Sequence, residues 1–95
     1  MTASSAMLSR SLMIVNKRGL HARASARFVQ TVGGYDAKVR VTREGSTVGG
    51  TSIMGLMMLA ASPGCSILVE AEGDQAEQVL DALEELVADR FGEGE

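Results

Sequence analysis

The chain has 95 residues, 45% of them hydrophobic, and a formal net charge of −3, which together fit one compact domain. Its three aromatic residues are too few for a surface that stacks nucleic-acid bases, and its longest apolar run, residues 53–61, is well short of the roughly 20 residues that a membrane helix needs. A single cysteine excludes an intramolecular disulfide, so we expect a cytoplasmic protein without a signal peptide or membrane insertion.

The first third of the chain predicts a strand followed by a helix. Residues 1–6 are small and polar, so we expect a flexible tail before a single domain that spans residues 7–92. Apolar side chains occur on both alternating faces of residues 8–15, which predicts a strand covered on more than one side. Residues 22–32 have helical spacing, and the apolar stripe of this helix would consist of Ala22, Ala26, Val29 and Val32.

The middle of the chain predicts a hairpin and a second helix. Two alternating strands, at residues 37–42 and 47–49, would be joined by a turn at residues 43–46. Ser52 can cap a helix that runs from residue 53 to residue 59 or 61. This helix has more apolar side chains than one face can bury, so we expect some of its methionines to be exposed.

The last third predicts one more strand and the most clearly amphipathic helix. Residues 67–72 alternate as a strand, and Asp74 followed by Glu77 has the spacing of a helix-capping box. The apolar stripe of the helix extends as far as Phe91, its acidic outer face is most simply a solubilising surface, and residues 93–95 should fray. The order β-α-β-β-α-β-α predicts an α+β fold, an antiparallel sheet with helices on one side.

The only histidine, His21, lies where the first strand gives way to the first helix, so we place its imidazole at a helix N-terminus. Unpaired backbone N–H groups and the helix dipole disfavour an imidazolium there and favour a neutral ring, whose lone pair can act as a nucleophile. The same N–H groups can bind an anion. Four cations lie close in sequence, namely Lys17, Arg18, Arg23 and Arg27. This combination indicates a phosphoryl acceptor.

Without that context, His21 would be a polar capping residue on a surface loop. The rest of the chain offers no other catalytic chemistry, because one cysteine, one histidine and scattered carboxylates form neither a metal site nor a catalytic triad. We therefore expect no metal and no cofactor, and we interpret Cys65 as a small buried hydrophobic residue.

The motif Gly19-Leu20-His21-Ala22-Arg23, followed by Phe28-Val29 and by residues 51–56, resembles HPr, the histidine phosphocarrier family of the phosphoenolpyruvate-dependent phosphotransferase system. The resemblance covers residues 7–91, with the histidine and serine motifs in the family's order and spacing. It implies an open-faced two-layer sandwich with strand order 1-4-2-3 and three helices on one face. The family usually has proline after the motif arginine, whereas Ala24 here restores a backbone N–H in the first turn.

The resemblance implies that His21 accepts a phosphoryl group at Nδ1 from a phosphohistidine donor of the enzyme I type and passes it to a IIA-type acceptor. Arg23 would neutralise the phosphoryl oxygens, and the amides of Ala22 and Arg23 would bind them. The protein would be a carrier rather than an enzyme, in a sugar-transport or a nitrogen-regulatory branch. Ser52 lies where some HPr proteins are phosphorylated by an HPr serine kinase/phosphatase, although Thr51 replaces the basic residue that often precedes it.

The charges are distributed unevenly along the chain. Residues 1–69 contain eight Lys or Arg and two carboxylates, a net +6, whereas residues 70–95 contain one Arg and ten carboxylates, a net −9. The basic part suits an acidic partner or an anion, and the acidic part disfavours nucleic acid. A non-enzymatic regulatory module that binds acidic partners through the same basic and Met-rich surface is the alternative function. We expect partner-docking residues at Lys17, Arg18, Leu20, Arg27, Ile53 and Met54.

Overall fold

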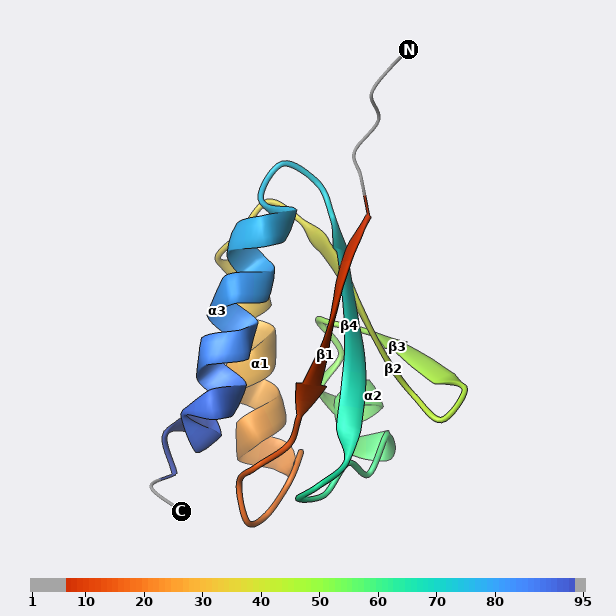
Figure 1. Cartoon of the computed structure of the whole chain (residues 1–95), viewed down its shortest axis with the longest axis vertical. Coiled ribbons are helices and arrows are strands. Elements are labelled where there is room, and N and C mark those ends of the chain that lie inside the picture. Colours follow the sequence, from red (N-terminus) through yellow and green to blue (C-terminus); the bar gives the residue numbers. More distant parts are fainter. Residues whose placement is uncertain (1–6, 94–95) are drawn as a thin grey trace.

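The computed structural model describes residues 7–93, and the predicted tail at residues 1–6 lies outside that range, as do residues 94–95. The predicted elements all occur in the predicted order (Figure 1). They are β1 (Leu8–Met13), α1 (Ala22–Gly33), β2 (Lys38–Arg43), β3 (Ser46–Gly49), α2 (Ile53–Met58), β4 (Ser66–Glu72) and α3 (Ala76–Ala88), followed by a short turn, η1 (Arg90–Gly92).

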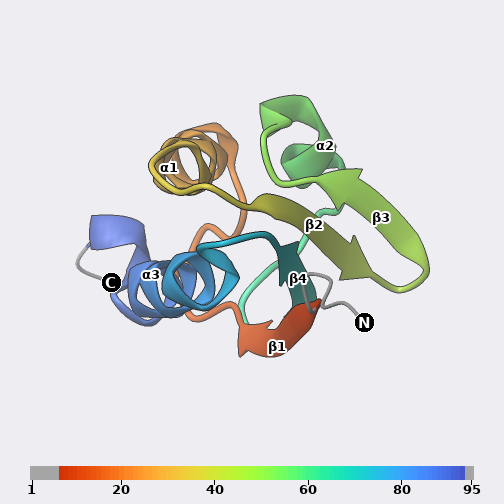
Figure 2. The same cartoon turned by 90° about the horizontal axis from the view of Figure 1, so that it is seen from above.

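The four strands form one antiparallel sheet in the order β1-β4-β2-β3, which confirms the predicted topology. Central strand β4 explains the arrangement, because it alternates between buried and more exposed side chains and pairs with both neighbours. Ile67 lies opposite Leu12 of β1, and Val69 lies opposite Val41 of β2. Figure 2 shows the three helices on one side of this sheet, so the fold is an open-faced two-layer sandwich.

The hydrophobic core lies between the helices and the inner face of the sheet. Each helix contributes a fully buried side chain, namely Phe28 of α1, Leu56 of α2 and Leu83 of α3. The predicted stripe of α1 is partly wrong, since Ala22 is exposed and the buried face consists of Ala24, Ser25, Phe28 and Val32. Ser25 can be buried because its hydroxyl donates a hydrogen bond to the carbonyl oxygen of Leu20, at 3.2 Å.

The predicted burial of the first strand on more than one side is also wrong. β1 is an edge strand, and no element among residues 7–93 covers its outer face, so Met13 is 56% exposed. On the inner face, Arg10 reaches α3 and forms ion pairs with Asp81 at 2.6 Å and Glu84 at 2.8 Å. The acidic face of α3 therefore also holds β1 in place, beyond the solubilising role that the sequence predicts.

The predicted capping box at Asp74 does not form. α3 begins one residue later than that cap requires, after Gln75, which makes no side-chain capping bond. The Gln75 side-chain oxygen accepts a hydrogen bond from the backbone N–H of Asp36 at 2.7 Å, and its own N–H donates to the Asp36 carbonyl at 2.9 Å. Contact with the loop after α1 thus replaces local capping.

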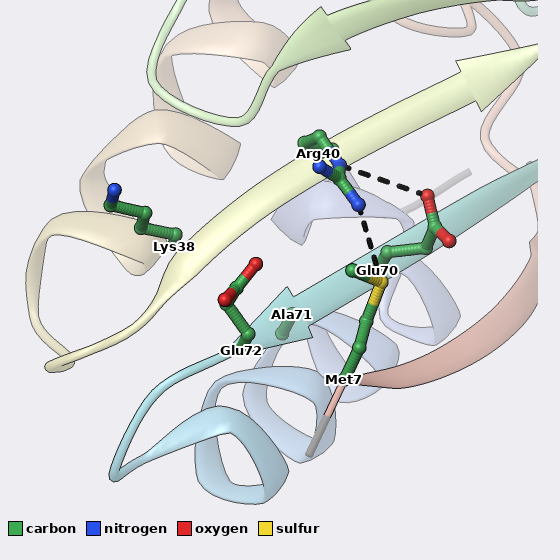
Figure 3. Close-up of a pocket in the computed structure, with 6 residues that line it drawn as sticks. All are labelled: Met7, Lys38, Arg40, Glu70, Ala71 and Glu72. Atoms are coloured by element: carbon green, nitrogen blue, oxygen red, sulfur yellow. Dashed lines mark hydrogen bonds and ion pairs between the residues drawn. The ribbon is translucent and has the colours of Figure 1, made fainter. Parts of the chain in front are cut away.

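The uncovered face of the sheet carries a shallow, charged hollow (Figure 3). Arg40 donates to the sulfur of Met7 at 3.2 Å and lies 3.9 Å from the carboxylate of Glu70, its partner across the strands. Lys38 and Glu72 form the next pair along β2 and β4. Opposite charges across neighbouring strands stabilise a sheet by a few tenths of a kcal/mol to about 1 kcal/mol, and such side chains suit a face that is in contact with solvent.

Candidate functional site

His21 is the N-cap of α1, as the sequence predicts. Its backbone is extended, with φ −75° and ψ −178°, and its Nδ1 accepts a hydrogen bond from the backbone N–H of Arg23 at 3.3 Å. The side chain is 17% exposed, so most of the ring is covered by protein. A nitrogen that accepts a hydrogen bond carries a lone pair, so this contact places the unprotonated nitrogen of the ring at the helix N-terminus.

The loop that carries His21 is supported by the loop that follows α2. Ile14 and Leu20 donate backbone hydrogen bonds across this contact, to Cys65 at 2.8 Å and to Ala61 at 3.0 Å. Gly19 has φ +67°, and a Cβ atom there would clash with the Ala61 carbonyl oxygen, so only glycine fits. Leu20 is 4% exposed, so its predicted role in partner docking is wrong: it anchors the loop in the core.

Asn16 is a buried polar residue of the site that the sequence analysis missed. It is 0% exposed, and its Nδ2 donates to the carbonyl oxygen of Gly19 at 2.9 Å and to Oε1 of Glu93 at 3.1 Å. Its own oxygen, Oδ1, has no hydrogen-bond partner among the residues that the structure describes. The only signal in the sequence was an asparagine that directly follows an apolar strand.

Glu93 is the second residue that the sequence analysis missed. The structure contradicts the predicted fraying at this position, because Oε2 of Glu93 is hydrogen-bonded to Nε2 of His21 and the side chain is only 9% exposed. Burial raises the pKa of the Glu93 carboxyl, but hydrogen bonds from His21 and Asn16, together with nearby positive charge that includes Arg18, lower it below its ordinary value of 4.5. The carboxylate is therefore held in its charged form.

The predicted cations lie on both sides of His21 along the chain. Lys17 and Arg18 are exposed in the loop before it, whereas Arg23 and Arg27 are exposed on successive turns of α1. The guanidinium of Arg27 lies beside the turn η1, with Nη1 at 3.5 Å from where a Cβ on Gly92 would be. All four cations are therefore exposed to solvent, two in the loop before His21 and two on α1.

Ser52 is the N-cap of α2, which confirms the sequence-based assignment. Its hydroxyl oxygen accepts a hydrogen bond from the Gly55 N–H at 3.0 Å, and the residue is exposed. The helix beyond it leaves several apolar side chains in solvent: Met58 is 79% exposed, Met54 70% and Ile53 40%. Since α2 packs beside α1, this apolar surface lies next to the helix that His21 caps (Figure 2).

Cys65 differs from its predicted role as a buried hydrophobic residue, because it is only partly buried. Hydrogen bonds from Ser62, followed by one from Arg43, lower the pKa of its thiol. The guanidinium of Arg43 lies 3.2 Å from the sulfur and donates to the Leu59 carbonyl oxygen at 3.0 Å. These contacts hold the loop after α2, the same loop that supports Gly19 and Leu20.

Two further findings concern residues 7–93 as a whole. No group of three or more His, Cys, Asp or Glu side chains in this range could hold a metal ion. In the same range, no helix has the length and apolar character that crossing a membrane requires.

Comparison with known proteins identifies the family. A family model described as the PTS HPr component phosphorylation site matches residues 8–89. The chain is 48% identical over 89 residues to the phosphocarrier protein HPr of Cupriavidus necator, covering 94% of this chain and 100% of that protein. It is 51% identical over 85 residues to the phosphocarrier protein HPr of Pseudomonas aeruginosa, covering 88% and 94%. The crystal structure of HPr-C-His from Thermoanaerobacter tengcongensis matches with a TM-score of 0.86 and 40% identity, covering 90% of this chain and 97% of that one. The chain therefore belongs to the HPr family, the phosphocarrier proteins of the phosphotransferase system.

Proposed function

We propose that His21 carries the phosphoryl group and that Nδ1 is the atom that bonds to it. The observation that supports this most directly is the 3.3 Å contact from the Arg23 backbone N–H to Nδ1. It requires a lone pair on that nitrogen, and a lone pair at a helix N-terminus is suited to attack an anionic phosphoryl group.

The donor is a phosphohistidine of an enzyme I-type protein, which itself takes its phosphoryl group from phosphoenolpyruvate. The Nδ1 lone pair attacks the phosphorus atom, and the new N–P bond forms as the donor's N–P bond breaks. The electron pair of that broken bond stays on the donor imidazole. The same exchange in reverse passes the group to a IIA-type acceptor. No other reactant takes part, so the protein acts as a carrier in the cytoplasm and its partners supply the catalysis.

A phosphoryl group on Nδ1 would meet the first turn of α1. The backbone N–H groups of Ala22 and Arg23 belong to that turn, where the helix dipole favours negative charge. The Arg23 guanidinium is exposed and can neutralise the phosphoryl oxygens through charge-assisted hydrogen bonds. Transfer from a phosphohistidine to a second histidine needs this kind of charge compensation more than it needs an acid or a base.

Partners would dock on the basic and apolar surfaces beside His21. Lys17, Arg18 and Arg27 provide positive charge, while Ile53 and Met54 provide flexible apolar contact on α2. An acidic patch around the active site of each partner would match the charges. The same surface could serve a regulatory protein-binding module without phosphoryl transfer, so the experiment must measure the transfer itself.

Ser52 would regulate docking when an HPr serine kinase/phosphatase modifies it. Its hydroxyl is exposed at the start of α2, beside the surface proposed for the donor. A phosphate adds a charge of about −1.5 to −2, which a helix N-terminus tolerates but an acidic donor repels. The modification would therefore weaken donor binding without unfolding α2.

The test is incubation with radiolabelled phosphoenolpyruvate and an enzyme I-type protein. We expect wild type and the capping variant Ser52→Ala to acquire a label that is lost in acid and stable in base, and His21→Ala to acquire none. Acid-stable label on the wild type would contradict the histidine mechanism. If the wild type binds the donor but takes up no label, the regulatory-module function is correct instead.

A further inference from the structure

The imidazole of His21 is held at both of its nitrogens. The Arg23 N–H donates to Nδ1 at 3.3 Å, and the Glu93 carboxylate is bonded to Nε2 on the opposite side of the ring. An ionised carboxylate can only accept hydrogen bonds, so Nε2 must carry a proton. The backbone donor at Nδ1 requires a lone pair there. Both contacts thus select the same tautomer of the neutral ring.

Asn16 holds the Glu93 carboxylate against the ring. Its Nδ2 donates to Oε1 of Glu93 at 3.1 Å and to the Gly19 carbonyl at 2.9 Å. If the amide were rotated, its oxygen would face two acceptors, so this orientation is determined by the hydrogen bonds. The two carboxylate oxygens are divided between partners: Oε1 binds Asn16 and Oε2 binds His21.

The backbone before Glu93 is folded in an unusual way that brings it to His21. Arg90, Phe91 and Gly92 have φ values of 56°, 54° and 77°, a left-handed run in which only glycine is comfortable. Phe91 is nonetheless 0% exposed, so its burial in the core stabilises this strained turn. The turn directs Glu93 back toward the start of α1, where its side chain becomes nearly as buried as the core. The contact therefore belongs to a constrained segment.

We propose that Glu93 is a positioning residue for His21: its carboxylate, held by Asn16, binds the proton of Nε2 and leaves the lone pair on Nδ1. Two consequences follow. Nε2 is closed to a phosphoryl group, so transfer occurs at Nδ1 alone. The carboxylate also compensates the positive charge that develops on the ring as the Nδ1–P bond forms, and it does so from the side of the ring away from the phosphoryl group.

Nitrogen-15 NMR of the full chain tests where the proton lies, and this part does not depend on the proposed function. We expect a proton coupled to Nε2 that exchanges slowly with water, and an unprotonated Nδ1, in wild type. Glu93→Ala should lose the Nε2 proton signal to fast exchange. Glu93→Gln keeps an oxygen that can accept and should keep the signal. The exposed Glu85→Gln on α3 removes the same charge elsewhere and serves as the matched control.

The rate of phosphoryl acceptance from an enzyme I-type donor tests the consequence, which rests on the proposed function. By analogy with other carboxylates that orient a histidine, we expect Glu93→Ala to be slower by roughly tenfold, with Glu93→Gln between it and wild type and Glu85→Gln unchanged. A proton on Nδ1 in wild type, or a signal and rate unaltered in Glu93→Ala, would overturn the proposal. Faster phosphoryl acceptance by Glu93→Ala would also overturn the proposal, because it would mean that the Glu93 side chain hinders the approach of the donor to His21. If no variant is phosphorylated at all, the proposed function fails, while the NMR result still decides the position of the proton.

Discussion

Helices α1 and α2 begin with different capping side chains, and the two caps differ in how many polar contacts hold them. His21 caps α1 and is tied to Arg23 and Glu93, with buried Asn16 behind them. Ser52 caps α2 through one hydrogen bond, from the Gly55 N–H, and the two residues that follow it, Ile53 and Met54, are exposed. A site that forms a covalent bond needs a fixed atom, so polar contacts hold it on several sides. A surface that meets several partners benefits from flexible methionines and few fixed contacts.

The largest expected effect is a loss of stability on substitution of Gly19, in the loop that carries His21. Gly19→Ala places a Cβ against the Ala61 carbonyl at a positive φ, so we expect the free energy of unfolding to fall by about 3 kcal/mol. Gly64→Ala is the matched control, because Gly64 also has a positive φ but open space around it. It should cost about 1 kcal/mol. Urea denaturation measures both free energies of unfolding. Equal losses in the two variants would mean that the close approach of Gly19 to Ala61 does not contribute to stability.

Substitution of Ser52, at the start of α2, should change phosphoryl transfer more than it changes stability. We expect Ser52→Asp to fold at least as stably as Ser52→Ala, which loses the capping bond and about 1 kcal/mol. Ser52→Asp should nevertheless accept phosphate from the donor several-fold more slowly, with the deficit in donor affinity. Transfer kinetics over a range of donor concentrations separate affinity from rate. Equal acceptance by the two variants at matched stability would leave Ser52 as a cap only.

Arg27 tests the charged part of the proposed docking surface, because it is exposed one turn beyond Arg23. Arg27→Glu should weaken docking and reduce its dependence on salt, since exposed charges act over about 8 to 10 Å at physiological ionic strength. The free energy of unfolding should change by less than about 0.5 kcal/mol. Stopped-flow transfer measured at two salt concentrations checks this. Unchanged kinetics would remove Arg27 from the docking surface.

The smallest expected effect is a loss of stability in acid, where the contact between Glu93 and His21 at the start of α1 weakens. The pKa of Glu93 is lowered in the folded protein, so its contact stabilises the fold above the ordinary value of 4.5 and is lost as pH falls through the lower folded value. The His21 ring and Asn16 donate hydrogen bonds to this carboxylate, and Arg18 supplies nearby positive charge. The carboxyl carbon-13 shift of Glu93 should titrate below that of a short peptide with the same sequence, while the Gly55 amide does not follow it. A Glu93 titration at the peptide's value would show that the contact is weak.

Local features of the chain were predictable from the sequence because they depend on neighbours within a turn or a strand. Alternation and helical spacing predicted the order of the elements, and the caps at His21 and Ser52 follow from residues two or three positions away. The family resemblance supplied the strand order, because the alternation of apolar and polar side chains along each strand does not determine which strands are neighbours.

Only the tertiary structure decided which distant side chains meet. Glu93 is hydrogen-bonded to the ring of His21, 72 positions earlier in the chain. The turn that brings Glu93 to this position is left-handed, a conformation that the propensities of its non-glycine residues disfavour. Leu20 and Ser25 became buried, and Met13 exposed, because of where the two layers lie. Such contacts depend on the closure of the whole fold and on polar groups that burial forces to pair, so periodicity cannot encode them.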